Sequence, residues 1–256
     1  MVKVELGKHQ VELYASIEEL PVARFHKYNK CVLVEAGIGS DLSQLDMHIA
    51  RAVEYIKQGE RDDAAKELQN LRQNVLMIHE GLNPQSMAFA CLVASVDGEP
   101  QTDISDDGLQ RVVSMFADVP MKDITAQAEA VKKKIDAELL MYYPNIFDDA
   151  RVKEYYDMLH RRTMLVLENI TKGETKERNE QIERLTADML TYSKPKNFVG
   201  KDSAEIVYDK QFDELCLFIS QELHSNAKNM SVMEFYNAYM YIEKRANKRK
   251  RQNNAR

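Results

Sequence analysis

The chain of 256 residues is 44% apolar and 30% charged, and its net charge is −6. This is a globular composition, which excludes an intrinsically disordered chain. No apolar run approaches the roughly 20 residues that span a bilayer, and the N-terminus lacks the features of a signal peptide, so we expect no membrane contact and no secretion.

The first residues predict a β-hairpin. Apolar and charged residues alternate in residues 2–6 and again in residues 11–13, and Gly7-Lys8-His9-Gln10 separates the two runs. A single hairpin is only marginally stable in water, so it must pack against the chain's own helices or against a neighbouring subunit. We expect a subunit interface here, with Val4 and Leu13 among its residues.

Only nine glycines and six prolines occur, which favours helices over most of the chain. Apolar periodicity predicts one helix opened by Pro21 and ended by Gly37, and a second capped by Asp41 and ended by Gly59. A third helix follows after a short joint, so the second and third should form an antiparallel helical hairpin. Each of these two carries an apolar stripe, formed by Leu42, Leu45, Ile49, Ala52, Val53 and Ile56 in the second and by Ala64, Leu68, Leu71, Val75 and Ile78 in the third.

The middle of the chain alternates helices with short breaks. Asn83 is expected to cap a new helix, and the run 87–96 is apolar on every side, which predicts a buried central segment. Ser105 should cap the following helix. Two long amphipathic helices come next, and they are ended by Pro144 and Gly173.

The C-terminal part is predicted to be a separate module. Residues 174–192 are highly charged, and the next ten combine Pro, Gly and polar residues, as is typical of a linker. Beyond them one helix is expected around Ile219, and a capping box from Ser231 to Glu234 begins the last helix. The sequence therefore predicts a mainly α fold, a multi-helix bundle with a small N-terminal β-hairpin and a C-terminal helical module, divided into residues 1–193, a linker 194–203 and residues 204–256.

Signatures of catalysis or metal binding are absent from the sequence. Gly37-Ile38-Gly39-Ser40 lacks the lysine of a phosphate-binding loop, and the acidic run 97–107 does not fit the spacing of a calcium-binding loop. The six histidines never pair at metal-ligand spacing, and Cys31, Cys91 and Cys216 lie far apart among apolar residues, as buried free thiols do. We therefore predict a non-enzymatic protein with no catalytic residue, cofactor or metal. An active site assembled from distant residues is the alternative.

The last predicted helix is unusual in its charge and in its aromatic residues. Residues 244–256 carry seven Lys or Arg and no acid, whereas the remaining residues carry 28 bases against 41 acids, a net charge of −13. Three interpretations stay open for this tail: a solvated helix end, a non-specific contact with nucleic-acid phosphates, and a contact with an acidic surface of a neighbouring subunit. The surplus of aromatic residues predicts an interface. The contact residues would be the cations Lys244, Arg245, Lys248, Arg249, Lys250 and Arg251, and the aromatic residues Phe235, Tyr236 and Tyr239.

Two stretches carry a family resemblance. The segment Ile17-Glu18-Glu19-Leu20-Pro21-Val22-Ala23-Arg24-Phe25-His26-Lys27-Tyr28-Asn29-Lys30, followed by Gly37-Ile38-Gly39-Ser40-Asp41, resembles the N-terminal part of helical proteins encoded by crAss-like tailed bacteriophages of Bacteroides. Met141-Tyr142-Tyr143-Pro144, after a long amphipathic helix, fits the same pattern, and the resemblance extends over about residues 1–170.

The resemblance implies a structural protein of the virion, made in the host bacterial cytoplasm. It would be an oligomeric, portal-associated neck or tail ring subunit. Its partners would be further copies of itself, neighbouring virion proteins and, through the basic tail, DNA bound without sequence preference. The alternative is a cytosolic phage assembly chaperone or adaptor, which binds another virion protein and leaves before the particle matures.

Overall fold

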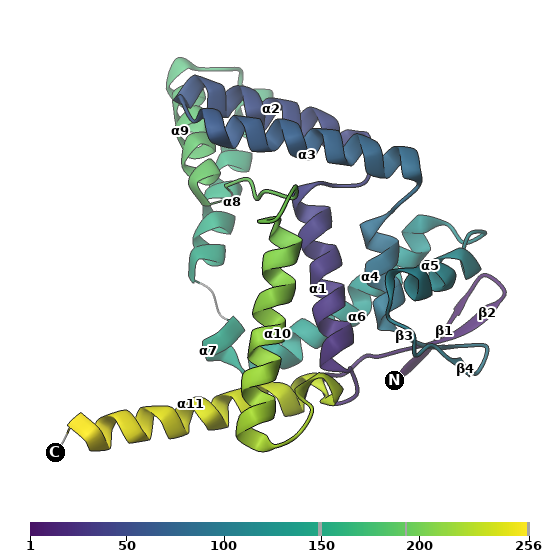
Figure 1. Cartoon of the computed structure of the whole chain (residues 1–256). Coiled ribbons are helices and arrows are strands. Elements are labelled where there is room, and N and C mark those ends of the chain that lie inside the picture. The colour runs from purple at the N-terminus through teal and green to yellow at the C-terminus, as the bar shows by residue number, and fades with distance from the viewer. Residues whose placement is uncertain (148–149, 193, 255–256) are drawn as a thin grey trace.

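The computed structural model describes the backbone of residues 1–147, 150–192 and 194–254, and their side chains except those of residues 150–152, 191 and 249–254. The chain is 72% helical and begins with an antiparallel β-hairpin, which confirms the predicted mainly α fold (Figure 1). The strands are β1 (Val2–Leu6), β2 (His9–Leu13), β3 (Val93–Val96) and β4 (Glu99–Pro100). The helices are α1 (Val22–Gly37), α2 (Ser43–Gln58), α3 (Arg61–Glu80), α4 (Pro84–Leu92), α5 (Asp106–Met115), α6 (Met121–Tyr142), α7 (Pro144–Phe147), α8 (Ala150–Lys172), α9 (Lys176–Tyr192), α10 (Ala204–Leu223), the 3-10 turn η1 (Ala227–Asn229) and α11 (Val232–Asn254).

The hairpin belongs to a four-stranded antiparallel sheet in the order β1-β2-β3-β4. The turn between β3 and β4 has positive φ at Asp97 (52°) and Gly98 (84°), as a type I′ turn requires. Asp97 also ties this turn to β2, because its carboxylate accepts from the Gln10 backbone N–H at 2.9 Å and lies 2.6 Å from Nδ1 of His9. The hairpin is therefore held by a strand from the middle of the chain.

The main hydrophobic core lies between this sheet and helices α1, α4, α5 and α6. Leu6, Val11 and Leu13 are at most 3% exposed, and they belong to the same cluster as Phe89 of α4. The expectation that Leu13 lies at a subunit interface is therefore wrong, because its side chain is enclosed by the chain's own core. The hairpin packs against the chain's own helices, which was the other alternative. Val4 is half-buried against the same cluster.

The apolar run 87–96 changes secondary structure in its middle. Asn83 caps α4 as predicted, and its side chain accepts from the Ser86 backbone N–H at 3.0 Å. The helix ends at Leu92, and the next four residues form β3. Residues 88–96 are all buried, so the run is the expected central segment, one half helix and one half strand.

The C-terminal helices pack against the N-terminal ones. Figure 1 shows α10 beside α1, and α11 crossing the lower end of both. The backbone N–H of Val22 donates to Met230 O at 2.9 Å, and Val22 shares a second core cluster with Ile219 and Phe235. The structure therefore corrects the interface expectation for Phe235 also, since this side chain is 2% exposed within the chain's own core.

The predicted capping box at the start of α11 is confirmed. Ser231 Oγ accepts from the Glu234 backbone N–H at 3.2 Å, and the Glu234 carboxylate accepts from the Ser231 backbone N–H at 2.8 Å. Two N–H groups that a helix start leaves without partners are satisfied in this way.

The segment 194–203 between α9 and α10 has no regular secondary structure, as expected of a linker, yet it is anchored to its surroundings. Phe198 is 8% exposed and packs with Val34 and Ile38 at the end of α1. The Lys196 carbonyl accepts from the Asn70 side chain of α3 at 3.1 Å. These contacts join the end of α1, the middle of α3 and the start of α10.

Helices α2 and α3 form the predicted antiparallel hairpin, which lies as a layer across the upper ends of α1 and α10 (Figure 1). Gly59 ends α2 with a φ of 79°, a left-handed conformation that glycine adopts without steric cost.

Candidate functional site

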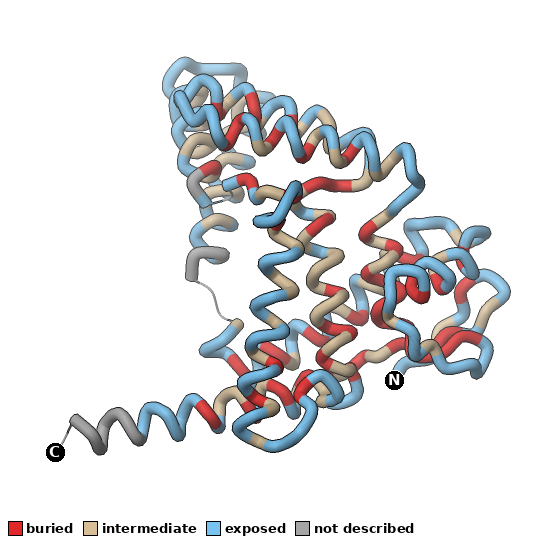
Figure 2. The backbone as a smooth tube through the Cα atoms, viewed as in Figure 1, coloured by how far each residue is buried: buried red, intermediate tan, exposed pale blue. Residues whose placement is uncertain are grey.

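The α2–α3 hairpin exposes its apolar side. Apolar residues on one side of a helix normally face the core. Here, six of the eleven residues of the predicted stripe and the neighbouring Leu76 are 41–69% exposed, and Figure 2 shows exposed residues alternating with buried ones along both helices. We call these seven residues the α2–α3 face: Leu42, Ile49, Val53, Ile56, Leu68, Val75 and Leu76.

The buried side of the same hairpin is largely polar. His48 and Glu67 are 1% exposed, and His48 Nδ1 lies 2.7 Å from the Glu67 carboxylate. His48 Nε2 donates to the Ile38 carbonyl at 2.8 Å, and the Asn74 side chain donates to the same carbonyl at 3.0 Å. Together with the bond from Asn70 to the segment 194–203, these contacts hold the hairpin on the body of the protein.

Backbone carbonyls that have no partner within their own helix or segment explain why the polar side of α2–α3 is buried. Ile38 lies at the C-terminal end of α1, where carbonyl groups have no partner within the helix. Leu190 and Lys196 present further carbonyls, which accept from Tyr55 at 3.3 Å and from Asn70. A layer that covers such groups must bring donors, because a buried carbonyl without a partner is costly. The polar side of α2–α3 therefore faces inward.

The apolar residues of the two helices lie on one face of the hairpin. His48 of α2 and Glu67 of α3 point toward each other, along the line between the two helix axes. Ile49 and Leu68 are the next residues in each helix, so each side chain is turned about 100° away from that line. Because the helices are antiparallel, the same step along each chain leads to the same side of the pair. Val53 and Ile56 lie within about 40° of Ile49 around α2, and Val75 lies within about 20° of Leu68 around α3, so these residues share that side of the hairpin.

A second helix also carries exposed apolar residues. On α8, Tyr156, Met164, Leu167 and Ile170 are 48–75% exposed. They recur at the spacing of one helix face. We call these four residues the α8 face. The α8 face is therefore a second helix surface on which apolar side chains are at least 48% exposed.

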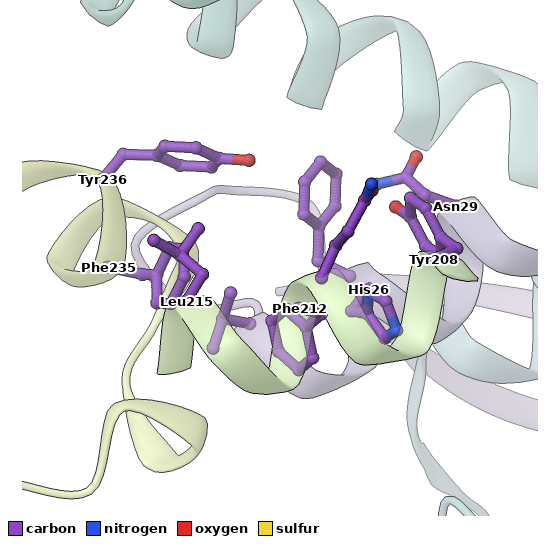
Figure 3. Close-up of a pocket in the computed structure, with 10 residues that line it drawn as sticks. His26, Asn29, Tyr208, Phe212, Leu215, Phe235 and Tyr236 are labelled. Carbon is purple, nitrogen blue, oxygen red and sulfur yellow. The ribbon is translucent and has the colours of Figure 1, made fainter. Parts of the chain in front are cut away.

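A pocket of about 180 Å³ lies where α1, α10 and α11 meet (Figure 3). His26 stacks on Tyr208 and Phe212, with ring centroids 4.5 and 3.9 Å apart and both pairs nearly parallel. In Figure 3, the Tyr236 hydroxyl points across the hollow toward Asn29 and Tyr208. The remaining lining residues are Val22, Phe25, Gln211, Leu215 and Phe235.

His26 has the most distinctive electrostatics of this pocket. Its Nε2 lies 2.8 Å from the Asp209 carboxylate, which also accepts from Lys30 at 2.6 Å. Burial lowers the pKa of His26 despite the charge of Asp209, so the ring is neutral at pH 7 and donates from Nε2. A His–Asp pair is one part of many hydrolytic sites, but no Ser, Thr or Cys is among the residues that line this pocket. The pair therefore serves to join α1 to α10.

The predicted contact residues of α11 fall into two groups. Tyr236 and Tyr239 are half-buried and pack against the second core cluster, so only part of each ring faces solvent. Lys244, Arg245 and Lys248 are exposed on the part of α11 that projects from the body (Figure 1). The side chains of Arg249, Lys250 and Arg251 lie outside the described residues.

Metal ligands and membrane spans were searched over the described part of the chain. No group of three His, Cys, Asp or Glu side chains is placed to hold a metal ion there. In the same residues, no helix is both long and apolar enough to cross a bilayer. All three cysteines are free thiols, and Cys31 is half-buried whereas Cys91 and Cys216 are buried.

Comparison with known proteins gives no relative: no protein-family model, no curated protein and no solved structure matches this chain. The functional argument therefore depends on the surfaces described above. Sequence reasoning missed three of their features: the outward direction of the α2–α3 face, the α8 face, and the His26–Asp209 pair. The stripe on α2 and α3 was visible in the sequence, but not the side that it faces.

Proposed function

We propose that this chain is a non-enzymatic subunit of a protein assembly and that it binds a second copy of itself through the α2–α3 face. The observation that carries this proposal is the orientation of the hairpin, which buries His48, Glu67 and Asn74 and exposes seven large apolar residues. Monomeric soluble proteins rarely expose large contiguous apolar patches, and such patches mark protein interfaces.

The α8 face supports a second copy as the occupant. It lies on a different helix, so contact between the α2–α3 face of one copy and the α8 face of the next joins two different surfaces. Contacts of this heterologous kind generate a ring when the rotation closes, and a filament when it does not. A ring agrees with the resemblance to neck and tail proteins of crAss-like phages, and we propose that form of assembly, in the virion, for this chain.

The projecting end of α11 provides a further contact in this proposal. Lys244, Arg245 and Lys248 extend from a body whose net charge is strongly negative. A single chain should therefore bind nucleic acid weakly, because the body repels phosphates. Several tails directed into one ring would add their charges, and multivalency would raise the affinity for DNA in its channel.

The test is the native mass of the purified protein and of a variant with Ile49→Glu and Val53→Glu. Burying the exposed half of each side chain stabilises the contact by about 1 kcal/mol, and each new carboxylate would be buried without a partner. We expect the dissociation constant to rise at least about 100-fold, which corresponds to about 2.8 kcal/mol.

The matched control is Ala50→Glu with Gln58→Glu, because both residues are exposed on α2 but outside the apolar face. The control should keep the mass of the wild type, and all three proteins should give the same circular dichroism. A wild type that stays monomeric at high concentration would overturn self-assembly. Capture of a different virion protein by that monomer would favour the adaptor function.

A further inference from the structure

The pocket between α1, α10 and α11 has room for one small molecule. Its volume is about 180 Å³. An apolar cavity of about 150 Å³ holds a single benzene, whereas sites for larger ligands and cofactors measure about 300–1,000 Å³. The pocket therefore fits one aromatic ring with a small substituent, and it is too small for a nucleotide.

Aromatic side chains form most of the walls of this pocket. His26 of α1 stacks nearly parallel on Tyr208 and Phe212 of α10, with ring centroids 4.5 and 3.9 Å apart. Phe25 and Phe235 contribute from α1 and α11, and both are at most 7% exposed. Walls of this kind favour a planar ring, because aromatic rings attract one another in offset-stacked and edge-to-face arrangements.

Three polar groups meet at the hollow of the pocket. In Figure 3, the hydroxyl of Tyr236 points across the hollow toward Asn29 and Tyr208. Neither the two hydroxyls nor the Asn29 side chain makes a hydrogen bond to another described residue. Burial raises the pKa of Tyr236 to about 12 and also raises the pKa of Tyr208, so both hydroxyls keep their protons at neutral pH and can donate.

The ring of Tyr236 is held in place by its neighbours in the core. Its centroid lies 5.1 Å from that of Phe147, and 5.5 and 5.6 Å from those of Tyr143 and Phe235. The hydroxyl of Tyr236 is therefore positioned before any ligand arrives. A group that is fixed in this way loses little conformational entropy when a ligand binds to it.

The lining of the pocket favours a neutral ligand that carries a hydrogen-bonding group. No Asp, Glu, Lys or Arg is among the described residues that line it, and His26 is neutral at pH 7. An ion would therefore be buried without an opposite charge, which is costly. A purely apolar ring would cover the three polar groups without offering them hydrogen bonds, which is also unfavourable.

We propose that this pocket binds an uncharged phenolic ring, which lies between the aromatic walls with its hydroxyl bonded to Tyr236, Tyr208 or Asn29. Two sources supply such a ring: a free phenolic compound, and a tyrosine side chain of another protein. The chemistry of recognition is the same for both. The site is independent of self-assembly, because none of its lining residues belongs to the α2–α3 face or the α8 face.

The experiment titrates para-fluorophenol with the full-length protein and follows the probe by fluorine NMR. We expect saturable binding that is at least about 5-fold tighter than that of fluorobenzene, which has the same ring but no hydroxyl. Tyr236→Phe keeps the ring and removes only the hydroxyl, so it should weaken the binding of para-fluorophenol about 2- to 10-fold without weakening that of fluorobenzene. The matched control is Tyr241→Phe on the same helix. Tyr241 is 54% exposed and outside the pocket, so this variant should bind as the wild type does.

A second pair of variants tests the location of the site. Leu215→Phe enlarges a side chain on the wall of the pocket and should abolish saturable binding of both probes. Leu217→Phe is its control, because Leu217 is 60% exposed and does not line the pocket. N-acetyltyrosinamide separates the two sources. If it competes with para-fluorophenol, a tyrosine side chain is the ligand, and if it does not, the ligand is a free phenolic compound.

Three results would overturn the proposal. The first is a wild type that shows no saturable binding of para-fluorophenol, and the second is a wild type that binds fluorobenzene equally well. The third is binding of para-fluorophenol that is unchanged in folded Tyr236→Phe and Leu215→Phe proteins. The comparison of the two probes needs no variant, so a loss of folding in either substitution leaves the test decisive.

Discussion

The buried pair of His48 and Glu67 should make the stability of this protein depend on pH. His48 Nδ1 faces the Glu67 carboxylate at 2.7 Å, and Nε2 faces the Ile38 carbonyl at 2.8 Å. Both neighbours are hydrogen-bond acceptors, and an imidazole donates from both nitrogens only when it is protonated. Burial opposes that charge, but the hydrogen bonds to Glu67 and Ile38 outweigh it and raise the pKa of His48.

The direction of the effect follows from this shift. The pKa of His48 in the folded state lies above the unfolded value of about 6.5, so the stabilisation is complete below that pH and is lost as the pH rises through the folded pKa. Within this window the free energy of unfolding should change by at most about 1.4 kcal/mol per pH unit. His26 acts in the opposite direction. Burial lowers its pKa, so its contribution is present above about pH 6.5 and is lost as the pH falls through its folded pKa.

A substitution separates the two histidines. In Glu67→Gln, the neutral amide can donate to a neutral His48, but it cannot stabilise the imidazolium. We expect a loss of about 3 kcal/mol near pH 6, the lower end of what breaking a buried ion pair costs, and about 1 kcal/mol near pH 9. Urea unfolding followed by circular dichroism measures both values. The exposed Glu80 on the same helix provides the control, and Glu80→Gln should leave stability within about 0.5 kcal/mol at either pH. A cost of Glu67→Gln that does not change with pH would refute the assigned protonation state.

Three further predictions concern other parts of the chain. Ser231→Ala removes one half of the capping box and should cost about 1 kcal/mol, seen as a fall in Tm of about 2–4 °C in thermal unfolding; an unchanged Tm would contradict it. Leu13→Asp places a charge in the main core and should lower the free energy of unfolding in urea by about 3 kcal/mol or more. The same change at half-buried Val4 should cost clearly less. Equal costs at the two positions would show that the hairpin packs differently. Deletion of residues 244–256 should leave Tm within about 1 °C, because the described side chains of residues 244–248 are exposed. The deletion should also abolish any salt-sensitive binding to duplex DNA, measured by fluorescence anisotropy. DNA binding that survives the deletion would place the contact elsewhere.

Local signals explain why the sequence predicts many helix boundaries correctly. Asn83, Ser105 and Ser231 each accept from a backbone N–H of the first turn that follows, and Gly59 ends a helix with positive φ. Each signal acts within a few residues, so it is legible in one sequence. The boundary at Leu92 lacks such a signal, because an apolar run fits a buried helix and a buried strand equally well.

Contacts between distant residues could not be predicted in this way. Periodicity finds the apolar stripe of α2 and α3, but it does not say whether that stripe faces the core or a partner. The direction is decided by carbonyls at Ile38 and Lys196, which belong to other elements and have no side-chain signature. The His26–Asp209 pair likewise joins residues from helices far apart in the chain.

The polar attachment of the α2–α3 hairpin links its local stability to assembly. Its inner side is held mainly by hydrogen bonds and one buried ion pair, and the net contribution of such groups is smaller than that of apolar packing of the same area. The hairpin should therefore open locally more readily than the core formed by α1, α4 and the sheet. A partner on the α2–α3 face binds only the closed hairpin, so association stabilises it by mass action.

Amide hydrogen exchange tests this coupling directly. Protection of α2 and α3 should increase with protein concentration, while protection of β2 and α4 should not change. In the Ile49→Glu, Val53→Glu variant, the concentration dependence should vanish although the hairpin remains helical. If protection of α2 and α3 were independent of concentration in an oligomeric wild type, the interface would lie elsewhere, and the exposed apolar residues of the hairpin would need another occupant.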